Sequence, residues 1–156
     1  MISVKNGSRT LEFEGELLGS SSSYRAGSDR WIEFKIYKTA GDTYILSRVG
    51  VSLIYHVAAC PLVVRYTLQE ESVTDLDRRA TPCPDCGPTL EAPMVFPEKY
   101  RHWAFVTDVA EAVVDSLHKD DNYGGRYLTK VAQRVLEEAA EKDAELDAAY
   151  RVEFIE

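Results

Sequence analysis

The sequence is poor in cysteine and has no long apolar run. Three cysteines occur among 156 residues, an odd number that argues against a disulfide framework and favours a reducing compartment. No apolar stretch reaches the roughly 18 residues that a membrane-spanning helix needs. Residues 1–7 lack the apolar segment of a secretory signal. We therefore expect a cytoplasmic protein that does not enter a membrane.

Several motifs of common enzyme classes are also missing. The sequence contains no G-x-G-x-x-G, no phosphate-binding P-loop and no G-x-S-x-G nucleophile motif. No H-E-x-x-H or H-x-E pattern stands next to the cysteines, which disfavours a zinc hydrolase or deaminase. These absences favour a protein that is not an enzyme.

Length and charge limit the remaining classes. The 156 residues, 45% of them apolar, suit one domain spanning 1–156 with its own core. The net charge of −8 is unevenly distributed, because residues 1–65 hold eight Lys/Arg and six Asp/Glu whereas the rest hold ten and twenty. Only the first part is therefore expected to tolerate a polyanion.

Apolar residues alternate with polar ones through the first half, which predicts an antiparallel β-meander over residues 1–68. We expect strands at 11–17, 31–38, 43–56 with a break at Gly50, and 62–68. In the first of these, Leu11, Phe13 and Leu17 would face the core. A turn at 39–42 would place Gly41 at positive φ, and the Ser-rich stretch 19–30 is expected to be a loop.

The second half changes character. Residues 69–106 are expected to be irregular, with a short helix near 72–79 and four prolines between Thr81 and Pro93. Residues 107–156 are predicted to form a helix from Thr107 to about Lys119, an acidic helix from Arg126 to about Tyr150, and a last short strand. The predicted fold is α+β, with two C-terminal helices packed on one face of the sheet.

Four side chains match the ligand set of a structural zinc site. Cys83 and Cys86 form C-x2-C followed by glycine, and His56 and Cys60 stand four residues apart at the end of a strand-like run. This pattern resembles the knuckle of zinc-ribbon modules, although it uses His-x3-Cys for one pair and a long insert. The resemblance implies a closed structural Zn2+ site that ties the sheet to the middle segment.

Two alternatives remain open for these residues. His102 or His118 would replace His56 as the fourth ligand in one of them. In the other, Cys83 and Cys86 are a redox pair, but Gly87-Pro88 prevents the helix that normally activates the first thiol.

Two further patterns mark candidate functional residues in the first half. A basic and aromatic group could stack and neutralise single-stranded nucleic acid; it comprises Tyr24, Arg25, Arg30, Trp31, Lys35 and Lys38. Glu33-x-Lys35 is similar to part of a Mg2+-dependent nuclease motif, although alternating Glu and Lys is also ordinary sheet surface.

We therefore expect a zinc-stabilised binding or regulatory protein that acts through a protein partner, with the acidic helix and the Ser-rich loop as contact regions. Nucleic-acid binding and Mg2+-dependent nuclease activity on Glu33 and Lys35 are the alternatives.

Overall fold

The computed structural model describes residues 1–57, 68–71, 81–82, 94–97 and 100–151. It confirms an α+β protein with an antiparallel meander, and residues 107–151 hold three helices where two were expected. The chain divides into two compact units: Met1–Ser23, Glu33–Val49 and His102–Glu156 form the first, and Tyr24–Ile32 with Gly50–Arg101 form the second. The expectation of a single domain over 1–156 stays a prediction.

The main sheet has four strands in the order β10-β5-β4-β3. These strands are β3 (Gly15–Ser22), β4 (Arg30–Thr39), β5 (Tyr44–Ser52) and β10 (Tyr100–Thr107). A turn joins β4 to β5, and there Asp42, not Gly41, has positive φ, at 63°. Strand β10 falls where we expected irregular chain, and Gly50 lies inside β5 instead of at a break.

Strand β3 corrects two expectations about the sequence around Leu17. The register of β3 on β4 shifts between Leu17 and Gly19, which marks a β-bulge. As a result Leu18 is fully buried, whereas Leu17, the expected core residue, is 40% exposed. The strand continues to Ser22, so the first part of the expected Ser-rich loop is sheet.

The small residues of β3 form the surface on which a helix packs. Helix α2 (Lys130–Lys142) packs on β3, and a Cβ added at Gly19 would lie 2.8 Å from the Val135 carbonyl oxygen. The Ser21 hydroxyl donates to the Val131 carbonyl at 2.7 Å. Small side chains are therefore needed here because the helix backbone approaches the strand closely.

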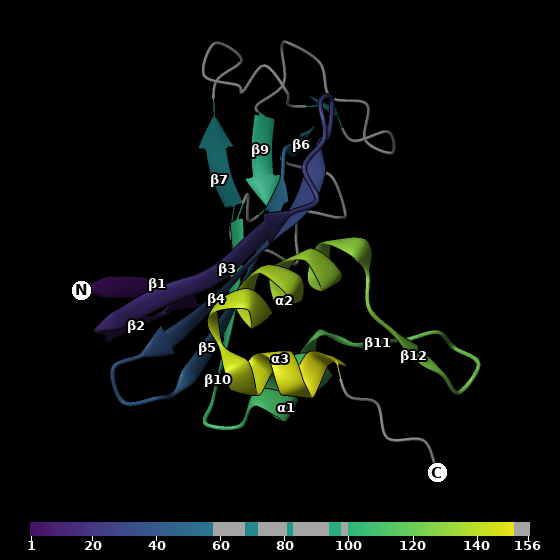
Figure 1. Ribbon diagram of the computed structural model, residues 1–156. Helices are drawn as coiled ribbons and strands as arrows, with labels where there is room; N and C mark the ends of the chain where they lie inside the picture. Colours follow the sequence, from purple (N-terminus) through teal and green to yellow (C-terminus); the bar gives the residue numbers. More distant parts are fainter. Residues whose placement is uncertain (58–67, 72–80, 83–93, 98–99, 152–156) are drawn as a thin grey trace. The chain divides into compact units, whose positions relative to one another are not determined.

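Three helices lie together on one side of the main sheet (Figure 1). Helix α1 (Ala110–Leu117) begins three residues after Thr107, whose hydroxyl accepts from the Val109 N–H. The expected acidic helix is two helices, α2 and α3 (Ala144–Arg151), interrupted at Asp143. Their buried apolar stripe follows the helical period; its members include Val131, Ala132, Val135, Ala139 and Leu146.

A hairpin covers part of the other face of this sheet. Strands β1 (Ile2–Asn6) and β2 (Arg9–Phe13) pair antiparallel, and Val4 packs with Ile45 and Ala104 in a small core. The hairpin turn also reaches the edge of β10: Gly7 N–H donates to the His102 carbonyl at 2.7 Å, and the Ala104 N–H donates to Asn6 Oδ1 at 3.1 Å.

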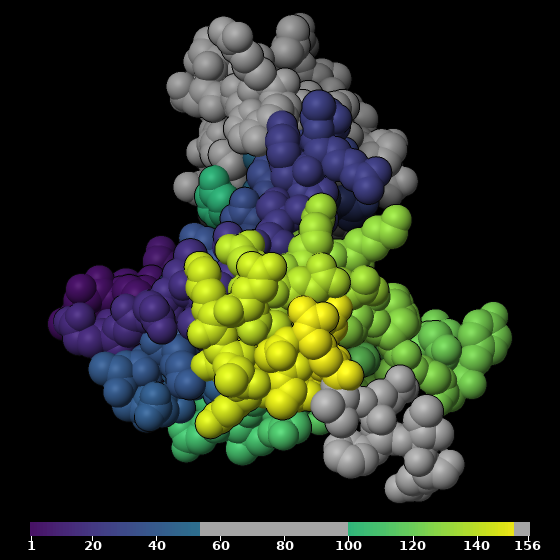
Figure 2. Space-filling model, viewed as in Figure 1, coloured from purple at the N-terminus to yellow at the C-terminus, as the bar shows by residue number. Residues whose placement is uncertain are grey.

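A second hairpin joins α1 to α2. Its strands β11 (Lys119–Asp120) and β12 (Arg126–Tyr127) pair antiparallel, and Figure 2 shows the segment as a green arm that projects beyond the helices. The Arg126 guanidinium donates to the Asp115 carbonyl at 2.8 Å, which fixes the base of this arm against α1.

The second unit contains a small sheet of order β7-β9-β6-β8. Its strands are β6 (Ile54–Val57), β7 (Leu68–Glu71), β8 (Thr81–Pro82) and β9 (Met94–Pro97). Strand β9 pairs antiparallel with β6 and β7, and β8 pairs parallel with β6. The expected helix near 72–79, most of the expected 62–68 strand and the expected last strand lie outside the described residues.

Candidate functional site

Most of the predicted zinc ligands lie outside the described part of the chain. Cys60, Cys83 and Cys86 are not described, and His56 is described only as a residue of β6 that pairs with Val95. Among the described residues, no group of three or more His, Cys, Asp or Glu side chains is placed to hold a metal ion. The zinc site, including the alternative ligands His102 and His118, stays a prediction.

The predicted basic and aromatic group does not form one surface within the first unit. Tyr24 and Trp31 contact each other edge to face, with ring centroids 4.9 Å apart, and Trp31 is only 9% exposed. Lys35 and Lys38 lie three residues apart on β4, so the alternation of a strand directs them to opposite faces. Arg25 and Arg30, like Tyr24 and Trp31, belong to the second unit.

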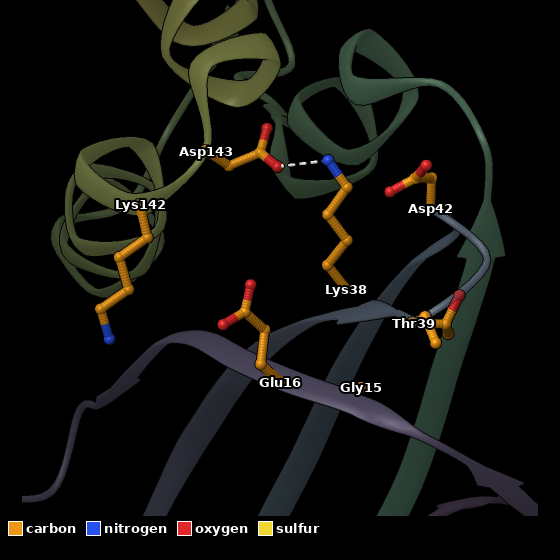
Figure 3. Close-up of a pocket in the computed structure, with 8 residues that line it drawn as sticks. Gly15, Glu16, Lys38, Thr39, Asp42, Lys142 and Asp143 are labelled. Atoms are coloured by element: carbon orange, nitrogen blue, oxygen red, sulfur yellow. Dashed lines mark hydrogen bonds and ion pairs between the residues drawn. The ribbon is translucent and has the colours of Figure 1, made fainter.

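Lys38 is committed to a buried network beneath the helices. Its Nζ lies 2.7 Å from Asp143 Oδ2, while Asp143 Oδ1 accepts from the Tyr44 hydroxyl at 2.8 Å and from the Leu146 N–H at 2.9 Å. Figure 3 shows Lys38 extended toward Asp143 and Lys142 turned away from it. Asp143 therefore ends α2, caps α3 and holds both to β4 and β5.

The network keeps fixed protonation states. The hydrogen bond to Asp143 raises the pKa of Lys38, against the opposing effect of burial. Burial and then the Asp143 hydrogen bond raise the pKa of Tyr44. Burial acts to raise the pKa of Asp143, but hydrogen bonds from Lys38, Leu146 N–H and Tyr44 outweigh it, and the pKa falls. Since none of the three titrates near neutrality, this arrangement suits a structural clamp better than proton transfer.

An open pocket of about 420 Å³ adjoins this clamp. Its charged lining residues are Glu16, Asp42 and Asp143 with Lys38 and Lys142, so three acidic groups face two cations, and Asp143 already neutralises Lys38. An anionic ligand would meet a net negative lining here. We assign this pocket no ligand.

A second pocket lies on the opposite face of the main sheet. It has a volume of about 270 Å³, and strands β1, β4, β5 and β10 all contribute to its lining. Both members of the predicted Glu33-x-Lys35 pair line this pocket, as does His102, one of the alternative zinc ligands. The polar residues that the argument below uses are Lys5, Glu33, Lys35, Tyr37, Ser47 and His102.

His102 in this pocket is held toward its neutral form. Burial, and then the nearby Lys5, lower the pKa of His102 from its ordinary value of 6.5. A neutral imidazole can both donate and accept a hydrogen bond.

The arm β11–β12 presents the most exposed large hydrophobic side chain of the described residues. Tyr123 at its tip is 94% exposed, and Tyr127 is 47% exposed. Asp121 Oδ1 accepts from the Tyr123 N–H at 2.8 Å and from the Gly125 N–H at 2.9 Å, so the tip has a defined conformation. The acceptance of these two N–H groups lowers the pKa of Asp121 and keeps it ionised.

The sequence analysis did not identify the central residues of the clamp, the second pocket and the arm. Asp143 lies inside the stretch from Arg126 to Tyr150 that was expected to be one acidic helix, although an Asp between two helical segments is a recognisable N-cap signal. Ser47 interrupts the apolar face of β5 and gave a weak signal of a polar site. The exposed aromatic residue of Asn122-Tyr123-Gly124-Gly125, between the two expected helices, was not singled out.

Comparison with protein-family models, with curated proteins and with solved structures found no match for this chain. Among the described residues, no helix combines the length and the apolar character needed to cross a lipid bilayer.

Proposed function

We propose that this protein is a zinc-stabilised binding protein, not an enzyme, and that it acts through a protein partner that contacts the β11–β12 arm. The observation that carries the proposal is Tyr123, a large aromatic side chain held almost entirely in solvent at the tip of an ordered hairpin. Tyrosine is enriched among the residues that dominate protein–protein binding energy.

The order of the arm supports this role. Asn122 and Gly124 have positive φ, at 67° and 84°, and the Asp121 carboxylate bridges two backbone N–H groups across the turn. A contact that is already ordered before binding loses less conformational entropy on association. Arg126 holds the base of the arm to α1, and the arm projects from there, so a partner can reach Tyr123 at its tip.

The test compares Tyr123→Ala with the wild type in affinity purification from the native host, followed by quantitative mass spectrometry. Loss of an interface hot spot of about 2 kcal/mol corresponds to roughly 30-fold weaker binding, so recovery of the specific partner should fall sharply. Folding should be unaffected because Tyr123 is 94% exposed.

Two further variants sharpen the result. Asp121→Ala leaves the aromatic ring in place but loosens the turn, and it should reduce partner recovery less than Tyr123→Ala does. Tyr100→Ala removes a 54% exposed tyrosine outside the arm and serves as the matched control. If the same proteins are recovered in equal amounts with wild type and Tyr123→Ala, the arm is not the contact surface.

The zinc part of the proposal rests on the ligand pattern of His56, Cys60, Cys83 and Cys86. Metal analysis of the purified protein should find one zinc ion per chain, and Cys83→Ser should lower both zinc content and thermal stability because metal-binding energy is folding energy. A protein free of metal with unchanged stability would contradict it.

The two alternatives have weaker support. Lys38 is engaged by Asp143 and Trp31 is buried, which removes two members of the proposed nucleic-acid surface. Among the described residues that line the pocket containing Lys35, Glu33 is the only carboxylate, whereas Mg2+ sites in nucleases use several oxygen ligands.

A further inference from the structure

The pocket beneath the β1–β2 hairpin contains a buried hydroxyl group that forms no hydrogen bond with any other described residue. Ser47 lies on β5 between Ile45 and Val49, is only 7% exposed and lines the pocket. In the described part of the chain its hydroxyl makes no hydrogen bond. Burying a hydroxyl that forms no hydrogen bond costs free energy. A serine at this apolar position of the strand is therefore better explained by a ligand that binds in the pocket and hydrogen-bonds its hydroxyl.

The charged groups of the lining indicate the sign of that ligand. Lys5 on β1 and Lys35 on β4 both line the pocket, and neither forms an ion pair with another described residue. With Glu33 as the one acid and His102 held toward its neutral form, the lining carries a net charge of about +1 in a chain of net charge −8. A local positive pocket on an acidic protein selects an anion.

The size and the remaining groups narrow the ligand class. A volume of about 270 Å³ lies near the lower end for small-molecule sites, so it suits one small molecule instead of a polymer. The Glu33 carboxylate disfavours ligands with many negative charges, and the half-buried Tyr37 supplies an aromatic wall.

We propose that this pocket binds a small organic anion whose phosphate or carboxylate group interacts with Lys5 and Lys35 and accepts a hydrogen bond from the Ser47 hydroxyl. None of the residues that line this site belongs to the β11–β12 arm. Ser47 would give specificity, because only a ligand that reaches the floor of the pocket satisfies it.

The experiment is a titration of the isotope-labelled full chain, followed by the backbone amide signals in NMR. Three probes separate the possible sources of the anionic group: inorganic phosphate, ribose 5-phosphate and malate. At least one organic probe should produce saturable shifts at residues 33–37, 47–49 and 102, and not at the arm.

Two variants and a control decide the interpretation. Lys35→Gln should weaken binding about tenfold or more, the usual effect of losing a charge-assisted hydrogen bond, whereas Lys130→Gln on the exposed start of α2 should leave it unchanged. Ser47→Ala should weaken binding and also leave the free protein equally or more stable to heat, since it removes an unsatisfied hydroxyl.

The titration and the two lysine variants together give results that either support or overturn the proposal. Saturable binding that Lys35→Gln weakens and Lys130→Gln does not supports the proposal, and the preferred probe identifies the anionic group. Absence of saturable shifts with all three probes overturns it. Equal weakening by the two lysine variants also overturns it, because the binding would then reflect diffuse charge.

Discussion

Asp143 offers the sharpest test of how the helices are held to the sheet. We predict that Asp143→Ala destabilises the protein by about 3–5 kcal/mol, the range for breaking a buried ion pair by removing one partner. Asp143 is 6% exposed and accepts three hydrogen bonds, from Lys38, Tyr44 and the Leu146 N–H. No single contact accounts for this magnitude.

The expected destabilisation is the sum of the interactions that the three donors lose when the Asp143 carboxylate is removed. The cap of α3 contributes about 1 kcal/mol. Loss of the main acceptor of the buried Tyr44 hydroxyl costs about 1–3 kcal/mol, and the Glu145 contact at 3.3 Å compensates only in part. Lys38, whose side chain is 22% exposed, would lose its charge partner in a poorly hydrated position. In a protein of 156 residues the sum corresponds to roughly a 10 °C fall in Tm.

The assay is urea unfolding followed by far-ultraviolet circular dichroism at neutral pH. This pH is suitable because the contribution of Asp143 is present above its unfolded pKa of 3.8 and is lost as the pH falls through its lower folded value. The contribution of Lys38 is present below 10.5 and is lost as the pH rises through its higher folded value.

Companion variants separate the charge from the cap. Asp143→Asn keeps an oxygen for the cap and for Tyr44, so it should cost roughly half as much as Asp143→Ala. A double-mutant cycle with Lys38→Met gives the coupling energy of the pair. Asp147→Ala on exposed α3 is the control and should change little. A loss of less than about 0.5 kcal/mol for Asp143→Ala would refute the clamp.

Two further predictions concern the β3–α2 contact and the partly buried His102. Gly19→Ala should destabilise the protein by about 1–3 kcal/mol in the same unfolding assay, because the added Cβ meets the backbone of α2 at 2.8 and 2.9 Å, whereas Gly41→Ala, with no atom nearer than 3.8 Å, should be nearly neutral. Equal effects would refute close packing as the reason for glycine. The lowered pKa of His102 means that the unfolded chain binds a proton near pH 6.5 and the folded chain resists it, so stability is retained above that pH and lost as the pH falls below it. His102→Gln should reduce the loss between about pH 7.5 and about pH 5.5, measured by urea unfolding, and an unchanged pH dependence would exclude His102 as its source.

The strong periodic patterns predicted the fold class and the buried faces of β4 and α2. Alternation placed Phe34 and Ile36 on the buried face of β4, and the helical period placed Val131, Val135 and Ala139 on the buried face of α2. Both patterns are local, and the packing agrees with them. The bulge at Leu18 was not predictable from alternation, because a bulge inserts one residue and reverses the faces before it.

The remaining errors have a common physical source, which is contact between residues far apart in the chain. The Ser-rich stretch lacks apolar side chains and was assigned to a loop, but Ser20–Ser22 are strand because α2 needs small residues beneath it. The break at Asp143 depends on partners about a hundred positions earlier, Lys38 and Tyr44. Local propensity carries no information about such partners.

The turn at Asn6-Gly7 affects how neighbouring molecules meet in concentrated solution. A bare outer strand is a template on which another polypeptide can add its own backbone, and sheets grow into aggregates by that route. Here the turn of the β1–β2 hairpin occupies part of the outer edge of β10. The Gly7 N–H donates to the His102 carbonyl, and Asn6 Oδ1 accepts from the Ala104 N–H. We therefore expect the first hairpin to hinder the addition of another strand at β10, in addition to its contribution of Val4 to the small core.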